Sequence, residues 1–297
     1  MTAKTTPAQV RAAWITRSEI ALIDLREEDP FAKDHPLFAV QIPLSRLELE
    51  ILDKVPRKAA PIVLYDNGEG LTSRAAHVLS SLGYTAVSEL DGGLEGWRKA
   101  GYELFQDVNS CSKAFGELVE HCRHTPSLPA PEAKALIESE FDLVVLDARR
   151  YDEFQTMSIP RGMSVPGAEL VLRAREIAPD PTTTIIVNCA GRTRSIIGAQ
   201  SLINAGVPNP VFALRNGSIG WKLAGQALDH GKAARFPNVT PKHVTEAKAK
   251  ARAVSYRAGV RRLDPAILAS LVQDDTRTLY RFDVRTQGEY ASGHIPG

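Results

Sequence analysis

Short runs of consecutive apolar residues alternate with amphipathic stretches along most of this chain. The apolar runs predict strands that are buried on both faces, and the amphipathic stretches predict helices that cover them. The expected strands are 21–25, 61–65, 143–146 and 183–187. The expected helices are 8–15, 73–82, 131–138 and 195–205, with a linker helix at 113–121. This alternation predicts an α/β fold with mainly parallel central sheets flanked by helices.

The pattern occurs twice in full, and matching residues recur with it. Asp24 and Arg26 return as Asp147 and Arg149, and a third such pair, Asp283 and Arg285, follows near residue 297. The predicted divisions are a first module at 1–108, a linker helix and loop at 109–127, a second module at 128–231, a connecting segment with an amphipathic helix at 232–259, and the truncated first part of a third module at 260–297. We expect this last part to be mobile or to pack on the second module.

The connecting segment carries one apolar stripe at helical spacing. Thr240-Pro241 predicts the helix start, with Thr240 as the cap. The stripe consists of Val244, Ala247, Ala251, Val254 and Ala258. The opposite face bears Lys248, Lys250 and Arg252, which we interpret as a solvated face rather than a nucleic-acid site.

Composition narrows the class of protein. With 297 residues, 43% hydrophobic and 24% charged, the chain resembles a soluble globular protein of about two domains. The net charge of +1 favours neither nucleic acid nor an anionic membrane as a partner, and no apolar stretch approaches the ~18 residues of a membrane span. The first residues lack an apolar signal core, and three cysteines suit a reducing compartment, so a cytoplasmic enzyme is expected. Nothing indicates the oligomeric state.

Cys189 stands at the most informative position. It lies between the end of an expected strand and the start of an expected helix. Backbone N–H groups and the helix dipole favour an anion at such a position. Arg192 and Arg194 add positive charge in the same turn. Such surroundings favour the nucleophilic thiolate. The competing interpretation is a buried apolar thiol, which does not explain why Arg192 and Arg194 lie so close to it.

The loop spacing distinguishes two kinds of cysteine chemistry. Four residues separate Cys189 from Arg194, whereas cysteine phosphatases place five residues between Cys and Arg, and here that next position is Ser195. The run Cys189-Ala190-Gly191-Arg192-Thr193-Arg194-Ser195 resembles the active loop of the rhodanese (thiosulfate sulfurtransferase) family. The segment from Gly217 to Trp221 is similar to that family's Gly-rich motif.

The resemblance implies tandem rhodanese-like domains and a sulfurtransferase. Such an enzyme moves sulfane sulfur from thiosulfate or a similar donor to a thiol or cyanide acceptor, through a persulfide on Cys189. It needs no metal or organic cofactor. The residues expected to bind the substrate are Ala190, Gly191, Arg192, Thr193, Arg194 and Ser195, and either hydroxyl among them is expected to donate a hydrogen bond to the sulfur.

Two alternatives stay open: a cysteine phosphatase or arsenate-reductase-like enzyme, and a non-catalytic binding protein of the same fold. The first module fits a non-catalytic role, because Asp66 stands at the position of Cys189 and Leu71 at that of Arg194.

Other conspicuous residues are interpreted structurally. The Asp147–Arg149 pair is expected to stabilise the fold, and Trp221 to pack in the core. Ser158 departs from the resembled pattern, which has His there. A further group matches no standard zinc spacing and is assigned to an ordinary helix; its members are Cys111, His121, Cys122 and His124.

Overall fold

The computed structural model describes residues 3–139 and 142–296. It divides into two compact units, Met1–Ser110 with Leu263–Gly297, and Cys111–Arg262. Each unit contains one five-stranded sheet in which all paired strands run parallel. The predicted α/β fold with parallel sheets is therefore confirmed.

The sheet of the first module has the order β1-β5-β4-β2-β3. In chain order its strands are β1 (Ala3–Thr5), β2 (Ala21–Asp24), β3 (Val40–Gln41), β4 (Ile62–Tyr65) and β5 (Val87–Leu90). Its helices are α1 (Pro7–Thr16), α2 (Glu28–Lys33), α3 (Leu47–Lys54), α4 (Thr72–Ser81) and α5 (Gly93–Lys99), with a 3₁₀ turn, η1 (Leu44–Arg46). Helices α1 and α5 share one hydrophobic cluster with the sheet, and α3 and α4 share the other.

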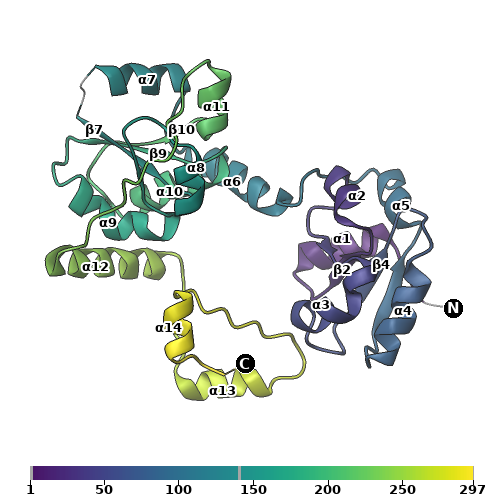
Figure 1. Cartoon of the computed structure of the whole chain (residues 1–297). Helices are drawn as coiled ribbons and strands as arrows, with labels where there is room; N and C mark the ends of the chain where they lie inside the picture. The colour runs from purple at the N-terminus through teal and green to yellow at the C-terminus, as the bar shows by residue number, and fades with distance from the viewer. Residues whose placement is uncertain (1–2, 140–141, 297) are drawn as a thin grey trace. The chain divides into compact units, whose positions relative to one another are not determined.

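The second module repeats this architecture with the order β6-β10-β9-β7-β8. Its strands are β6 (Ser127–Leu128), β7 (Leu143–Asp147), β8 (Gly162–Ser164), β9 (Thr184–Asn188) and β10 (Val211–Leu214). Its helices are α6 (Ser110–Arg123), α7 (Ala130–Glu138), α8 (Tyr151–Thr156), α9 (Leu170–Ile177), α10 (Thr193–Asn204), α11 (Gly217–Leu223) and α12 (Pro241–Arg257), with η2 (Gly167–Glu169). Helices α7 and α11 cover one face of the sheet, and α9 and α10 cover the other (Figure 1).

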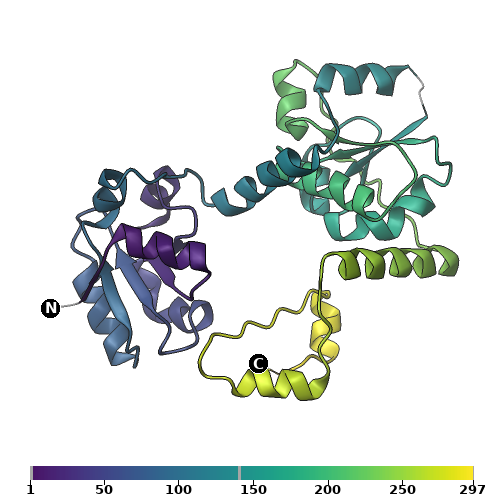
Figure 2. The ribbon, with the colours of Figure 1, turned by 180° about the vertical axis from the view of Figure 1, so that it is seen from behind.

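Helix α12 packs against α9, on the outer side of the layer that α9 and α10 form (Figures 1 and 2). Thr240 is the N-cap residue and Pro241 opens the helix, as predicted, while the Thr240 hydroxyl donates to Glu176 on α9. The expectation of a merely solvated basic face is wrong for Lys250, because its Nζ donates to the carbonyls of Ala205 (3.3 Å) and Gly206 (2.6 Å) at the end of α10. A cation at this end satisfies carbonyls that the helix leaves unpaired.

The third Asp-Arg pair forms the same local structure as the first two. Arg285 donates to Asp283 and to the carbonyl of Gly293 (2.8 Å), as Arg149 donates to Asp147 and to the carbonyl of Met157 (2.6 Å). Helix α14 (Gln287–Ser292) lies between the two ends, as α8 does in the second module. The Asp-x-Arg turn is therefore a local property of the sequence.

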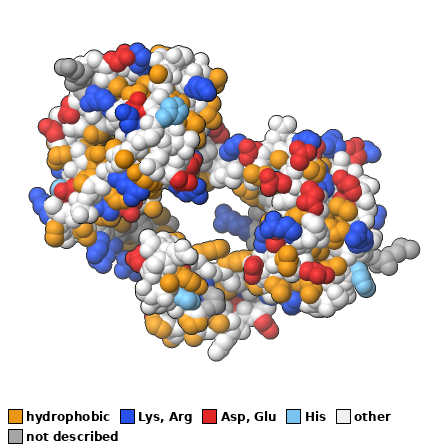
Figure 3. All heavy atoms as spheres, viewed as in Figure 1, with side chains coloured by type: hydrophobic (Ala, Val, Ile, Leu, Met, Phe, Trp, Pro, Cys, Tyr) orange, Lys and Arg blue, Asp and Glu red, His pale blue; other side chains and the backbone are white. Residues whose placement is uncertain are grey.

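Around that turn, however, the apolar residues are exposed. Phe282 is 83% exposed and Val284 95%, whereas Leu146 and Ala148 are buried at the matching positions of the second module. Figure 3 shows hydrophobic side chains on the surface of this segment, which also contains α13 (Pro265–Gln273). Of our two expectations for this segment, mobility or packing on the second module, the second is wrong, because the segment groups with the first module.

No helix within the described residues has the length and apolar character that crossing a bilayer requires.

Candidate active site

Cys189 directly follows β9, and α10 begins four residues later at Thr193. The cysteine is buried, with 2% of its surface exposed. Its thiol donates to Ser195 Oγ across 3.6 Å, and the Ser195 hydroxyl donates to the carbonyl of Arg192 at 2.8 Å. Of the two hydroxyls expected near the sulfur, the structure thus brings Ser195 to it. In this arrangement the serine accepts from the thiol.

The loop after Cys189 carries a run of backbone N–H groups without acceptors among the described residues. Residues 190–195 cross from β9 into the first turn of α10, and none of their backbone N–H groups has an acceptor among the described residues. The first N–H groups of a helix lack intrahelical partners and carry partial positive charge. The loop therefore has the donor arrangement of an anion site.

The segment at the start of α11 holds the Cys189 loop in place through backbone hydrogen bonds. At the start of α11, the N–H groups of Ser218 and Ile219 donate to the carbonyls of Cys189 (2.9 Å) and Ala190 (3.0 Å). Gly217 has φ +52°, and a Cβ there would lie 2.2 Å from the Cys189 carbonyl oxygen. Only glycine permits this approach, so the Gly-rich motif and the cysteine loop form one unit.

A buried ion pair supports the strand that delivers the cysteine. Arg149 Nε and Nη2 donate to Asp147 at 2.9 and 2.7 Å, and both residues are buried. Asp147 Oδ2 also accepts from Asn188 Nδ2 at 2.9 Å. The pair is structural, and it reaches the residue next to Cys189. Sequence reasoning missed Asn188, although its place before the cysteine was visible.

Both arginines of the loop are engaged by carboxylates that the sequence analysis did not identify. Arg192 donates to Glu117 at 2.7 and 2.9 Å, and also to Glu120, both on α6. Arg194 donates through both terminal nitrogens to Glu153 on α8, at 2.8 Å each. These partners lie 41 to 75 positions away in sequence, so no local signal indicated them.

The ionisation of these groups reflects the pairing. The hydrogen bonds from Arg194 hold the pKa of Glu153 at about 2, below its usual 4.5, although burial opposes this. The bonds to Glu153 in turn raise the pKa of Arg194, with a smaller contribution from Cys189. Glu117 likewise raises the pKa of Arg192. Glu153, Arg192 and Arg194 are therefore charged near neutral pH.

A cavity of about 350 Å³ adjoins the loop. Gly191, Arg192 and Thr193 form part of its wall. Lys113 and Glu117 of α6 add charge, and Ile219 and Leu223 of α11 add apolar surface. Three of the sequence-predicted residues thus line one opening, together with two helices that sequence reasoning did not connect to them.

The first module has a carboxylate where the second has the thiol. Asp66 follows β4 as Cys189 follows β9, and it is buried. Its Oδ1 accepts from the N–H of Gly68 at 2.9 Å, and its Oδ2 accepts from that of Leu71 at 2.6 Å. Two of the loop's own donors are therefore already used by Asp66.

The other residues singled out earlier lie outside this site. Trp221 is buried and donates to the carbonyl of Ala227 (2.8 Å), so it packs in the core as predicted. Ser158 is buried, and its hydroxyl has no partner within the described residues. In the first module, His35 occupies the matching position, stacks on Phe31 and is hydrogen-bonded with Ser110. Among the described residues, no three His, Cys, Asp or Glu side chains form a group suited to a metal ion.

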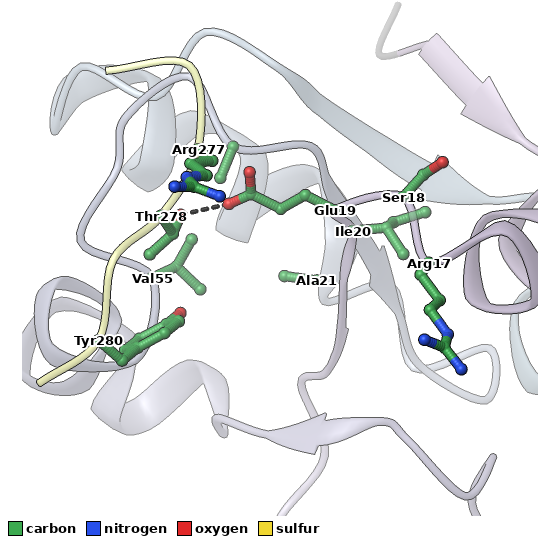
Figure 4. Close-up of a pocket in the computed structure, with 10 residues that line it drawn as sticks. Arg17, Ser18, Glu19, Ile20, Ala21, Val55, Arg277, Thr278 and Tyr280 are labelled. Carbon is green, nitrogen blue, oxygen red and sulfur yellow. Dashed lines mark hydrogen bonds between the residues drawn. The ribbon is translucent and has the colours of Figure 1, made fainter. Parts of the chain in front are cut away.

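A separate cavity of about 340 Å³ lies in the first unit, beside the residues that lead into β2 (Figure 4). Thr278 donates to Glu19 there, and Tyr280 donates to the carbonyl of Lys54 at 2.8 Å. Burial opposes ionisation of Glu19, but the bonds from Thr278 and Arg57 outweigh it and lower its pKa. These contacts explain why the last residues group with the first module.

Comparison with known proteins agrees with the two-module architecture. The model of the rhodanese-like domain family matches residues 6–100 and 129–224, more than half of the chain. A solved structure of a thiosulfate sulfurtransferase from Pseudomonas aeruginosa is 62% identical, with a TM-score of 0.95. The match covers 99% of this chain and 56% of that protein.

Two curated proteins match over shorter stretches. Thiosulfate sulfurtransferase PspE of Escherichia coli (strain K12) is 34% identical over 70 residues, which are 24% of this chain and 67% of that protein. The uncharacterized protein slr1261 of Synechocystis sp. is 32% identical over 91 residues, 31% of this chain and 50% of that protein. The chain thus spans about half the length of the solved protein and of slr1261.

Proposed function

Because the chain belongs to the rhodanese-like domain family, we propose that its second module is a sulfurtransferase. It moves sulfane sulfur from thiosulfate or a similar donor to a thiol or cyanide acceptor, through a persulfide on Cys189. The observation that carries this proposal is the set of unsatisfied backbone N–H groups of residues 190–195 around a single thiol. Such preorganised donors stabilise charge on a bound sulfur without reorganisation.

The reaction consists of two displacements at sulfur. The Cys189 thiolate attacks the outer sulfur of thiosulfate, a new S–S bond forms, and the bond to the sulfonate sulfur breaks. The electron pair leaves with sulfite, so charge and atoms balance. A thiolate or cyanide then attacks the outer persulfide sulfur, takes it as a persulfide or thiocyanate, and restores the Cys189 thiolate. Covalent catalysis of this kind divides one transfer into two easier steps.

The residues around Cys189 have distinct roles in this scheme. Once the thiol has lost its proton, the Ser195 hydroxyl is placed to turn from the Arg192 carbonyl and donate to the sulfur. The Arg194 guanidinium, fixed by Glu153, places positive charge at the end of the loop. Asp147 and Asn188 position the strand end and do not touch the reacting atoms.

The first module has a different role. Its Asp66 cannot form a persulfide, and its carboxylate already accepts the bonds that a bound sulfur would need. We assign it a scaffolding or binding function.

Intact-protein mass spectrometry after exposure to thiosulfate tests the proposal. The protein should gain one sulfur atom, cyanide should remove it as thiocyanate, and Cys189→Ser should gain none. Cys111 and Cys122 are exposed and serve as internal controls. Labelling of either in place of Cys189 disproves the site assignment, and aryl-phosphate hydrolysis that depends on Cys189 favours the phosphatase alternative.

A further inference from the structure

The charges around the active loop are balanced, although the loop itself is basic. Two arginines, Arg192 and Arg194, belong to the loop. Three carboxylates bind them: Glu117 and Glu120 on α6, and Glu153 on α8. A cleft lined by charges of one sign raises the association rate of an oppositely charged ligand by roughly 10–10³-fold. This effect falls steeply as the salt concentration rises. A balanced cleft lacks this attraction.

The balance affects possible donors differently. Thiosulfate carries two negative charges, and the charge on its sulfonate oxygens needs cationic partners beyond the loop's N–H groups. An organic thiosulfonate has the same sulfur–sulfur bond and carries one negative charge. Its organic group stands in place of one sulfonate oxygen of thiosulfate, together with one negative charge. Both terminal nitrogens of Arg194 already donate to Glu153. The loss of these donors therefore weakens the binding of thiosulfate more than that of the thiosulfonate.

The neighbouring cavity offers a place for such an organic group. Ile219 and Leu223 line it and are 58% and 82% exposed. They lie on α11, whose first residues hold the carbonyls of Cys189 and Ala190. Apolar surface thus adjoins the loop, within about 350 Å³ of space.

We propose that Glu117, Glu120 and Glu153 are specificity-determining residues, which turn the site from dianionic donors toward organic sulfane-sulfur donors carrying one negative charge. This inference rests on the sulfurtransferase function proposed above. The glutamates act through Arg192 and Arg194 and are therefore positioning residues rather than catalytic ones. The transfer is unchanged in form: Cys189 takes the outer sulfur, and the organic sulfinate leaves with the electron pair.

The test compares thiosulfate with benzenethiosulfonate in the full chain. The readout is the ratio of the two kcat/KM values, which a general loosening of the loop does not move, because both donors use the same loop. In Glu153→Gln and in the double variant Glu117→Gln with Glu120→Gln, this ratio should rise about tenfold in favour of thiosulfate. Glu138→Gln is the matched control, because Glu138 ends α7 before β7 begins, whereas Cys189 follows the carboxyl end of the parallel strand β9.

The results separate this inference from the proposed function. An unchanged ratio, or a shift toward benzenethiosulfonate, overturns the specificity role while sulfur transfer stands. Failure of both donors to load Cys189 in the wild type overturns the function itself. If the variants fold poorly, the wild type suffices: its kcat/KM for thiosulfate should change little with ionic strength, and a steep fall with added salt contradicts a balanced site.

Discussion

The Oδ2 atom of Asp66 lies 2.6 Å from the backbone nitrogen of Leu71, so the first module's loop closes on its own carboxylate. In the second module, the matching N–H groups have no acceptor among the described residues. The same fold thus presents one loop that is satisfied internally and one that is open to an anion. This contrast motivates the first prediction.

Asp66→Cys will not create a second sulfurtransferase site. In a chain that also carries Cys189→Ser, we expect no thiosulfate:cyanide transfer above the Cys189→Ser background. The new thiol would gain the N–H donors of Gly68 and Leu71 but no arginine, because Leu71 stands where the second module has Arg194. A colorimetric thiocyanate assay measures the outcome. Substantial activity would show that the loop backbone suffices.

Arg194→Ala should lower kcat/KM for thiosulfate by roughly 10²–10³-fold, the range typical of a preorganised charge-stabilising group. The change removes the guanidinium and leaves the Glu153 carboxylate with only the more distant Arg150, whose Nε lies 3.9 Å away. Lys248→Ala on α12 is the control, because Lys248 is exposed. Adding Glu153→Gln to Arg194→Ala should recover part of the loss. Equal kcat/KM values for Arg194→Ala and Lys248→Ala would exclude Arg194 from the mechanism.

Gly217→Ala should disrupt the active loop far more than Gly225→Ala. Both glycines have positive φ, +52° and +76°, so both substitutions carry a similar backbone cost of about 1 kcal/mol. A Cβ at Gly217 would meet the Cys189 carbonyl at 2.2 Å, whereas one at Gly225 meets nothing within 4 Å. Urea unfolding and persulfide loading measure the difference. Matching results for the two variants would refute the close approach.

Acid should destabilise the wild type more than Glu153→Gln. Because Arg194 lowers the folded-state pKa of Glu153 to about 2 from 4.5, the pair stabilises the fold above about pH 4.5. That contribution is lost as pH falls from 4.5 toward 2, where Glu153 becomes protonated. Chemical denaturation at a series of pH values should therefore show a shallower acid decline in the variant. Parallel curves for the two proteins would contradict the ion pair.

The sequence by itself determined the central strands, the helices next to them and their repetition. Continuous apolar runs have to be buried on both faces, so the strands around Leu22, Leu64, Val145 and Ile186 were predicted within a few residues, and so were helices α1, α4, α7 and α10. The short helices α2, α3, α8 and α9, which lie between paired central strands, were not predicted. The Asp-x-Arg turns were equally visible, because their bonds join residues only two to eight positions apart. Cys189 was identified for the same reason, since a strand end followed by a helix start is a local feature.

Only the tertiary structure decided which charges meet. Glu117 and Glu120 belong to a predicted helix and Glu153 to one that was not predicted, and nothing in their spacing links them to Arg192 or Arg194. The packing of α6 and α8 beside the start of α10 brings them together. The same holds for Lys250, which reaches the end of α10 once α12 has packed. A sequence pattern reports the face that a helix buries, whereas pairing between exposed ends depends on how the helices are placed in space.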